Sequence, residues 1–351
     1  MKKIFKTLLL IIIYIAIVYI ILWKMNLVTI QIKNPNSKEN SKAVDEYIDN
    51  DLSLEDKNLQ ITKGTENKFY YNQLDETSKA IYDKILESND KLKSGTSEIE
   101  FNNHEFDYIL SQENGMEILS QKFTEAIDSI KYDHVEIFYI DYTKMVIHTI
   151  THTVGNNESY EVFLSLAPTE ESYLKDEFIN KNLDIVLDEV ETLSDEILSK
   201  AEGTDYQKIQ YIHNWIVDNL EYDTTYEGPN NLNIYGALVE RKVVCEGYAK
   251  LFKYLLDKEQ IPCILVTGNA LNSIGEYESH MWNYVKINDT WYAFDVTWDD
   301  PILTNGGELP EANRYQYFCQ GDNINTNHFL IPSISEEGKE YEFPELYHKE
   351  K

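Results

Sequence analysis

Basic residues are scarce in this chain compared with acidic ones. Its 351 residues include 31 lysines and arginines against 61 aspartates and glutamates, which gives a formal net charge of −30. Nucleic-acid binding needs clustered Lys and Arg to displace counterions from phosphates. The shortage therefore argues against nucleic acid as a partner, and against an anionic membrane surface as the main substrate of the soluble part.

Cysteine is also rare, with one residue each at positions 245, 263 and 319. In an exported protein an odd count leaves at least one thiol unpaired. Cys263 lies in an apolar run and Cys319 follows two aromatic residues, so we expect both to be buried small hydrophobes. A disulfide between these two is the alternative. Cys245 is the cysteine whose surroundings favour a free thiol.

Only one long hydrophobic run is present, from about residue 7 to 23, and it follows Lys2, Lys3 and Lys6. A membrane-spanning helix needs roughly 17–25 residues, so residues 1–30 are predicted to form an N-terminal transmembrane signal anchor. The alternative is a cleaved signal peptide, but the run exceeds the usual ~7–15 residues and no small-x-small cleavage site follows. The basic flank predicts a cytoplasmic N-terminus and an extracytoplasmic remainder.

The rest of the chain divides into three predicted regions. Residues 31–65 are polar and read as a tether, and residues 66–170 as a small α+β domain. That domain has helical patterns from 69 and over 118–130, then alternating strands at 136–154 and 160–168 joined by a turn. Residues 171–340 form the third predicted region, a C-terminal domain. The composition, 42% apolar and 26% charged, is typical of folded globular proteins.

The C-terminal region opens with a helical stretch predicted over 170–201. Thr204 and Gln207 have the spacing of a capping box, which predicts a new helix start. Residues 246–258 read as another helix, and strands are predicted at 263–268, 280–287 and 291–298.

Cys245 immediately precedes the helix at 246–258. Backbone N–H groups and the helix dipole stabilise negative charge at such a position. The position therefore favours the thiolate, which is the nucleophilic form of cysteine. By itself the signal is weak, because a packed structural cysteine would look the same.

His280 and Asp295 lie on two strands that a turn at Asn288-Asp289 would close into a hairpin. That register places Trp282 opposite Asp295, so the histidine and the aspartate become diagonal neighbours on one face, roughly 7–8 Å apart at Cα. A shift of one residue would send them to opposite faces. An aspartate beside an imidazole fixes its tautomer and stabilises imidazolium. A purely structural histidine bonded to an acid is the competing interpretation.

Three segments together, VVCEGYA, SHMWNYVKI and WYAFDVTWDDP, resemble the core motifs of the transglutaminase-like superfamily, of a bacterial membrane-anchored type. The resemblance covers about residues 205–301 and extends more loosely towards His328. It implies that residues 171–340 form a transglutaminase-like domain, with an α+β, papain-like core in which the helix bearing the cysteine packs on an antiparallel sheet. The small α+β domain and the transmembrane helix would precede this core.

The resemblance implies that Cys245 is the nucleophile, His280 the general base and then acid, and Asp295 the group that orients His280. The backbone N–H of Cys245 would form part of the oxyanion hole. Tyr235 and Asn233 are candidates for its second donor. Asp299 and Asp300 are expected to terminate the strand.

No cofactor and no metal site is predicted. His148 and His152 have the spacing of a metal-binding helix pair, but they lie in a β-patterned run without the HExxH glutamate. A zinc site at Cys245, His280 and Asp295 is disfavoured because only three ligands are present, without a CxxC pair. No calcium loop of the EF-hand type occurs.

These features predict an extracytoplasmic thiol enzyme that acts on amide bonds of proteins or peptides, cell-wall peptide included, through an acyl-thioenzyme. Hydrolysis and transamidation are both open, because acceptor choice depends on water exclusion and cleft shape. The alternative is a catalytically idle module that binds surface protein or cell-wall peptide.

Overall fold

The computed structural model describes residues 68–95, 97–101, 106–272, 275–301, 313–334 and 339–348. The predicted anchor (1–30) and tether (31–65) lie outside these residues. Within them, no helix combines the length and the apolar character needed to cross a membrane. The described residues all fall in one compact unit, and the boundary proposed near residue 170 stays a prediction.

Helices dominate the first part of the described chain. They are η1 (Tyr71–Gln73), α3 (Glu76–Glu87), α4 (Asn89–Lys93), α5 (Asp107–Leu110) and α6 (Gly115–Asp133). The Asp75 side chain accepts a hydrogen bond from the Ser78 N–H and starts α3. Ile81 and Ile85 are buried where α3 packs against α6. The structure thus confirms the two helical patterns.

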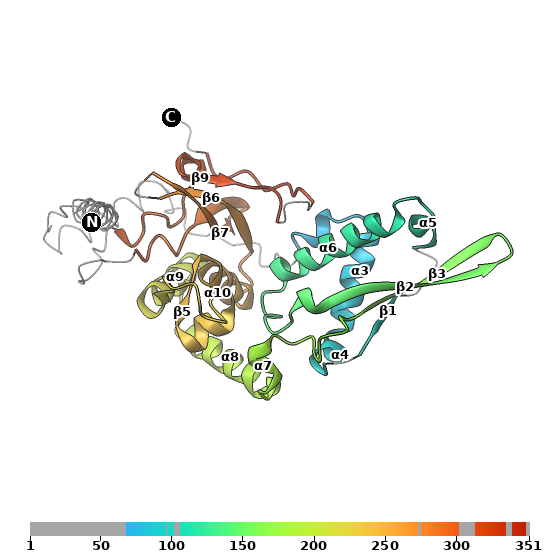
Figure 1. The fold of residues 1–351 in the computed structure, drawn as a ribbon. Coiled ribbons are helices and arrows are strands. Elements are labelled where there is room, and N and C mark those ends of the chain that lie inside the picture. The colour runs from blue at the N-terminus through green and yellow to red at the C-terminus, as the bar shows by residue number, and fades with distance from the viewer. Residues whose placement is uncertain are drawn as a thin grey trace, which may run out of the picture. The chain divides into compact units, whose positions relative to one another are not determined.

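A three-stranded antiparallel sheet in the order β1-β3-β2 packs beside these helices (Figure 1). Its strands are β1 (Ile99–Phe101), β2 (Met145–Val154) and β3 (Asn157–Leu166). The predicted hairpin forms, with Val154 opposite Asn157. However, its first strand begins at Met145 rather than 136, because Asp141 accepts a hydrogen bond from the Thr143 N–H and starts η2 (Tyr142–Lys144).

The long helix predicted over 170–201 is two helices, α7 (Asp176–Ile179) and α8 (Leu183–Leu198). The Asn182 side chain accepts a hydrogen bond from the Asp184 N–H, and such a cap starts a new helix instead of continuing the old one. The capping box predicted at Thr204 and Gln207 is present with both reciprocal hydrogen bonds. It opens α9 (Asp205–Asn219).

The remaining elements build the core around a four-stranded antiparallel sheet in the order β8-β7-β6-β9. They are β4 (Glu221–Tyr222), η3 (Gly236–Glu240), β5 (Lys242–Val243), α10 (Cys245–Lys258), β6 (Cys263–Leu271), β7 (Tyr277–Ile287), β8 (Thr290–Phe294), η5 (Asp322–Thr326) and β9 (His328–Leu330). Helix α10 packs against β6 and β7. This is the α+β core with a cysteine-bearing helix on an antiparallel sheet that the sequence predicted.

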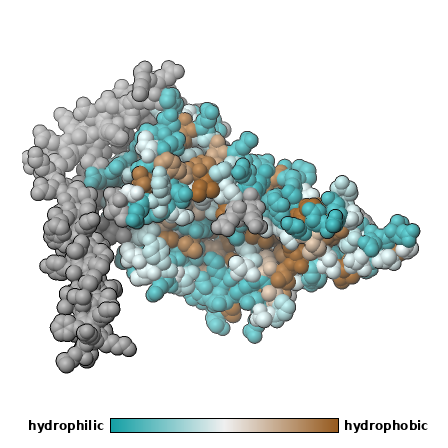
Figure 2. Space-filling view, turned by 45° about the horizontal axis from the view of Figure 1, so that its top comes forward, coloured by the Kyte–Doolittle hydropathy of each residue, from teal (hydrophilic) through white to brown (hydrophobic). Residues whose placement is uncertain are grey.

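Specific hydrogen bonds join the first helices to this core. The Tyr70 hydroxyl donates to the Leu265 carbonyl of β6 at 2.7 Å. The Asp133 carboxylate at the end of α6 accepts from the N–H groups of Tyr70 and Tyr71. The face drawn in Figure 2 is largely hydrophilic, with hydrophobic residues in separate patches.

Candidate active site

Cys245 is the first residue of α10 and is half-buried. Val244 before it is extended, and no side chain caps the helix, so first-turn N–H groups are left for other acceptors. A Cβ at Gly247 would lie 2.5 Å from the Cβ of Val243 and 2.9 Å from the Asn231 carbonyl oxygen. Glycine at this position therefore lets β5 and the preceding loop pack directly against the start of the helix.

The β7–β8 hairpin has the predicted turn and register. Asn288 and Asp289 have φ values of 50° and 62°, as a type I′ turn requires. Pairing runs from Ile287 opposite Thr290 to Asn283 opposite Phe294. The same register carried one residue further places Asp295 on the sheet face of His280.

The strand that precedes this aspartate is shorter than predicted. It ends at Phe294 instead of continuing to Trp298. The Asp295 side chain accepts from the Trp298 N–H at 3.2 Å, and its carbonyl accepts from the Asp299 N–H. These bonds fold the chain into a turn immediately after β8, so Asp295 is the first residue beyond the strand.

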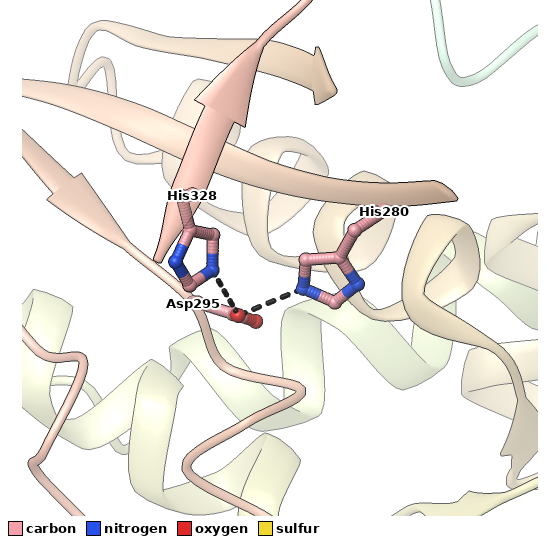
Figure 3. A group of neighbouring side chains, drawn as sticks. All are labelled: His280, Asp295 and His328. Carbon is pink, nitrogen blue, oxygen red and sulfur yellow. Dashed lines mark hydrogen bonds and ion pairs between the residues drawn. The ribbon is translucent and has the colours of Figure 1, made fainter. Parts of the chain in front are cut away.

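His280 and Asp295 form a buried hydrogen-bonded pair. The distance from His280 Nε2 to Asp295 Oδ2 is 2.8 Å (Figure 3). An ionised carboxylate only accepts hydrogen bonds, so Nε2 donates. The other ring nitrogen, Nδ1, is then the one available to the Cys245 sulfur.

The charges of this group favour an ion pair. Burial lowers the pKa of His280, but the Asp295 carboxylate and the Cys245 sulfur, which hydrogen-bonds the ring, together raise it to about 10. Burial raises the pKa of Asp295, but two imidazoles outweigh burial and hold it well below its usual value. The site thus stabilises an imidazolium between a carboxylate and the sulfur.

The second of these imidazoles belongs to His328, the first residue of β9. Its Nε2 lies 3.0 Å from Asp295 Oδ2, the same oxygen that binds His280 (Figure 3). Its side chain has no exposed surface. Strand β9 pairs with β6 on the far side from β8, with His328 opposite Ala270. This pairing brings in a residue that is remote from the hairpin in sequence.

A family model described as the transglutaminase-like superfamily matches residues 191–296. This part of the chain belongs to the transglutaminase-like superfamily. The matched residues include Cys245, His280 and Asp295. The membrane-anchored type suggested by the N-terminus stays a prediction.

Curated relatives and solved structures resemble parts of the chain. Kyphoscoliosis peptidase of Homo sapiens is 27% identical over 139 residues, which cover 35% of this chain and 21% of the relative. The Mus musculus protein is 26% identical over 122 residues, 32% of this chain and 18% of the relative. The match thus spans about a fifth of the length of these relatives.

Two solved structures are similar to parts of the chain. One is a crystal structure of a TGase, with 13% identity, 50% of each chain covered and a TM-score of 0.31. The other is the periplasmic domain of TgpA from Pseudomonas aeruginosa bound to ethylmercury, with 17% identity, 45% of this chain and 66% of that chain covered, and a TM-score of 0.24.

Sequence reasoning assigned no role to His328. The only signal was the loose extension of the resemblance towards it. The β9–β6 pairing that positions His328 has no local sequence signature, because β9 has only three residues. A buried histidine in such a short strand is otherwise read as core.

The two candidates for the second oxyanion donor are engaged elsewhere. The Tyr235 hydroxyl accepts from Lys181 Nζ at 3.2 Å, and its ring packs on Phe138. The Asn233 side chain bonds Asn230 and the Gly236 N–H within its own loop. Tyr222 is a third candidate by position: after burial, the nearby Cys245 sulfur raises the pKa of its hydroxyl, which also bonds Tyr226.

The two aspartates that follow Trp298 also have partners. Asp299 bonds His213 and the Tyr317 N–H, and Asp300 accepts from the Tyr248 hydroxyl. Both lie in the turn after β8 and do not end the strand themselves. The cysteines, all within the described residues, form no disulfide: Cys263 is buried and Cys319 half-buried.

Three side chains of the site, those of His280, Asp295 and His328, are grouped closely enough to hold a metal ion. Their spacing fits hydrogen bonds better. Both nitrogen-to-oxygen distances, 2.8 and 3.0 Å, are shorter than the separation of about 3.3 Å between ligands around tetrahedral zinc with bonds of about 2.0–2.1 Å. The shared oxygen is therefore best described as a double hydrogen-bond acceptor.

Proposed function

We propose that this protein is a thiol enzyme that acts on amide bonds of protein or peptide substrates through an acyl-thioenzyme intermediate. The observation that carries the proposal is the His280 ring, which bonds Asp295 through Nε2 and the Cys245 sulfur through its other side. This arrangement supplies a nucleophile, a proton carrier and an orienting carboxylate in one hydrogen-bonded group.

In the acylation step, His280 already holds the proton of Cys245 on Nδ1 as an ion pair, and the thiolate attacks the substrate carbonyl carbon. A carbon–sulfur bond forms, and the carbonyl oxygen takes up negative charge. The backbone N–H of Cys245 and the Tyr222 hydroxyl are the proposed donors to that oxygen. His280 then gives its proton to the leaving nitrogen as the carbon–nitrogen bond breaks.

In the second step, water or an amine attacks the thioester. His280, now neutral, takes a proton from the attacking group, and the carbon–sulfur bond breaks. The sulfur leaves as the thiolate beside protonated His280, which is the starting ion pair. With water the products are those of a peptidase or amidase, and with an amine the product is a new amide. The same three side chains serve both reactions.

A chemical test compares the three thiols of the full chain. Brief treatment with iodoacetamide at pH 7, followed by peptide mass spectrometry, measures how fast each thiol is alkylated. We expect Cys245 to react at least about tenfold faster than Cys263, because burial raises the pKa of the Cys263 thiol. The variant His280→Gln should slow the alkylation of Cys245 itself, because it removes the imidazolium that stabilises the thiolate.

Equal alkylation of Cys245 in wild type and His280→Gln would contradict the proposal. It would favour instead the idle module that binds protein or cell-wall peptide. Cys263 and Cys319 serve as internal references in the same sample, so a difference in reagent or unfolding affects all three.

We further propose, from the sequence alone, that residues 1–30 anchor the protein in a membrane and place the catalytic part outside the cytoplasm. Surface protein or cell-wall peptide would then be the accessible substrate. Protease shaving of intact cells tests this, with loss of the catalytic part expected and full protection contradicting it.

A further inference from the structure

His328 shares the carboxylate oxygen that orients His280, and this sharing has a consequence for the chemistry. Resting on the proposed function, we propose that His328 is a positioning residue: by donating from Nε2 to Asp295 Oδ2, it holds the carboxylate in place and limits how strongly Asp295 attracts the His280 proton.

The carboxylate of Asp295 is fully occupied. Oδ1 accepts from the Trp298 N–H, and Oδ2 accepts from both imidazoles. When two donors share Oδ2, each hydrogen bond weakens the other, because both polarise the same oxygen. His328 therefore competes with His280 for the same lone pairs, and removing it leaves a carboxylate that binds the His280 proton more tightly.

The orientation of His328 is fixed independently of its charge. Its Nδ1 lies 2.8 Å from Asn327 Oδ1, and Asn327 Nδ2 donates to the Tyr317 hydroxyl at 3.1 Å. In this orientation Nδ1 donates to the amide oxygen. If the amide turned by half a rotation, Nδ2 would donate to Nδ1 and the Tyr317 hydroxyl to the amide oxygen. Nε2–H points at Asp295 in both cases.

Packing holds the same ring. It contacts Trp298 and Trp282 at centroid distances of 4.7 and 5.0 Å, nearly edge to face. The rings of His280 and His328 lie 5.6 Å apart. The titratable groups that face the shared carboxylate or the His280 ring from surrounding elements are Cys245 on α10, His213 on α9, Asp299 in the turn after β8, Tyr317 and His328.

The second reaction step is sensitive to this competition. There the neutral His280 ring must take a proton from water, and a more tightly held proton leaves less of the ring neutral. Attack by the thiolate needs no such neutral ring, since the ion pair already provides the nucleophile. Loss of His328 should therefore slow deacylation while sparing acylation.

The test uses the full chain and p-nitrophenyl acetate, an activated ester that acylates thiolates. The initial burst of p-nitrophenolate reports acylation, and the steady-state rate reports deacylation. For His328→Leu we expect a burst rate within about threefold of wild type and a steady-state rate about tenfold lower, as for a rise of one unit in the pKa of His280. In a pH profile of Cys245 alkylation, the change in rate that accompanies proton loss from His280 should move to higher pH by about one unit.

Two further variants separate positioning from a structural role. His328→Gln keeps a donor on its Nε2 atom and should restore the steady-state rate to within about threefold of wild type. His213→Gln alters another buried histidine and should leave the ratio of burst to steady-state rate unchanged, even if the melting temperature falls.

The outcomes distinguish the inference from the proposed function. A wild-type chain with neither a burst nor preferential Cys245 alkylation overturns the proposed function, and this inference with it. A reactive wild type whose His328→Leu variant has an unchanged ratio, or loses burst and steady state in parallel while melting normally, overturns the inference alone. A His328→Gln variant that behaves like His328→Leu does the same.

Discussion

Two buried aspartates in the described part of this protein each bond a histidine from α9 or β7, and one of these pairs is ionised while the other is neutral. His280 bonds Asp295 at 2.8 Å, and His213 bonds Asp299 at 3.0 Å. In the first pair the pKa of the histidine is raised to about 10 and that of the aspartate is lowered. In the second, burial lowers the pKa of His213 to about 4 and raises that of Asp299.

The difference comes from the partners around each carboxylate. Asp295 accepts from two imidazoles and one backbone N–H. Asp299 has one imidazole and the backbone N–H groups of Tyr317 and Gln316, and the charge of Asp295 lies near it. The first pair is therefore an ion pair and the second is neutral. Burial of a histidine beside an aspartate does not by itself make an ion pair, since the second imidazole and the adjacent thiol set the charge.

The largest expected contrast is between the two histidines. His280→Gln should lower Cys245-dependent ester turnover by on the order of 1000-fold, because general acid–base catalysis contributes about 10²–10⁴-fold. His213→Gln should stay within about threefold of wild type and mainly lower the melting temperature. Burst kinetics on both purified variants, with melting curves, check this. Equal losses of turnover would show that the two pairs are not functionally distinct.

The two aspartates should differ next most. Asp295→Asn removes the negative charge that stabilises imidazolium, and turnover should fall by about 100-fold. In the neutral pair, His213 Nδ1 donates to Asn214 Oδ1, so its Nε2 accepts from protonated Asp299. Asn at 299 keeps that donor and the oxygen that accepts from the Tyr317 N–H.

Asp299→Asn should therefore retain turnover within about threefold. Steady-state rates of the two variants, measured side by side at pH 7, give the comparison. A large loss in Asp299→Asn would mean that Asp299 is charged in the native protein and that the second pair is not neutral.

Tyr222 gives a smaller effect. Tyr222→Phe removes one proposed donor to the oxyanion, and we expect turnover to fall by about tenfold with an unchanged melting temperature. The matched control is Tyr235→Phe, whose hydroxyl bonds Lys181 and should not affect turnover. If Tyr235→Phe is the slower variant, the earlier candidate is the correct donor.

The pH dependence of stability separates the pairs by sign. Native Asp295 stays ionised below the ordinary value of 3.8, so the unfolded chain binds that proton first and the free energy of unfolding falls below about pH 4. Native Asp299 keeps its proton above pH 3.8, the ordinary pKa of aspartate, so it makes the free energy of unfolding fall as pH rises. Between about pH 4 and 6.5 this fall offsets the rise that comes from the lowered pKa of His213.

Urea denaturation between pH 3 and 7 measures these slopes. Asp299→Asn should begin to lose stability already as pH falls below about 6.5, the ordinary value for histidine, because the offset is gone. Asp295→Asn should lose less stability than wild type below about pH 4. Identical curves for the two variants would contradict the assignment of one ionised and one neutral pair.

Local signals in the sequence were sufficient for several features of the fold. The capping box at Thr204, the cysteine at the start of α10 and the hairpin turn at Asn288-Asp289 each depend on residues close together in the chain. Because side chains alternate along a strand, the turn alone fixed the face shared by His280 and Asp295.

Features that depend on single side-chain bonds or distant pairing were missed. The Asn182 cap divides the helix predicted over 170–201, and the Asp295 bond to the Trp298 N–H ends β8 early. His328 reaches the site only because β9 pairs with β6. Apolar periodicity contains no information on such contacts, since the first two are bonds between polar atoms and the third joins strands far apart in the sequence.

The acyl-thioenzyme is the central claim, and trapping it is the most direct test. The full chain would be incubated with a peptide mixture, quenched in acid and analysed by peptide mass spectrometry. We expect an acyl mass on the Cys245 peptide that hydroxylamine removes and that is absent from His280→Gln. A Cys245 that reacts with iodoacetamide but never acquires a hydroxylamine-sensitive acyl group from peptides would contradict the acyl-thioenzyme mechanism.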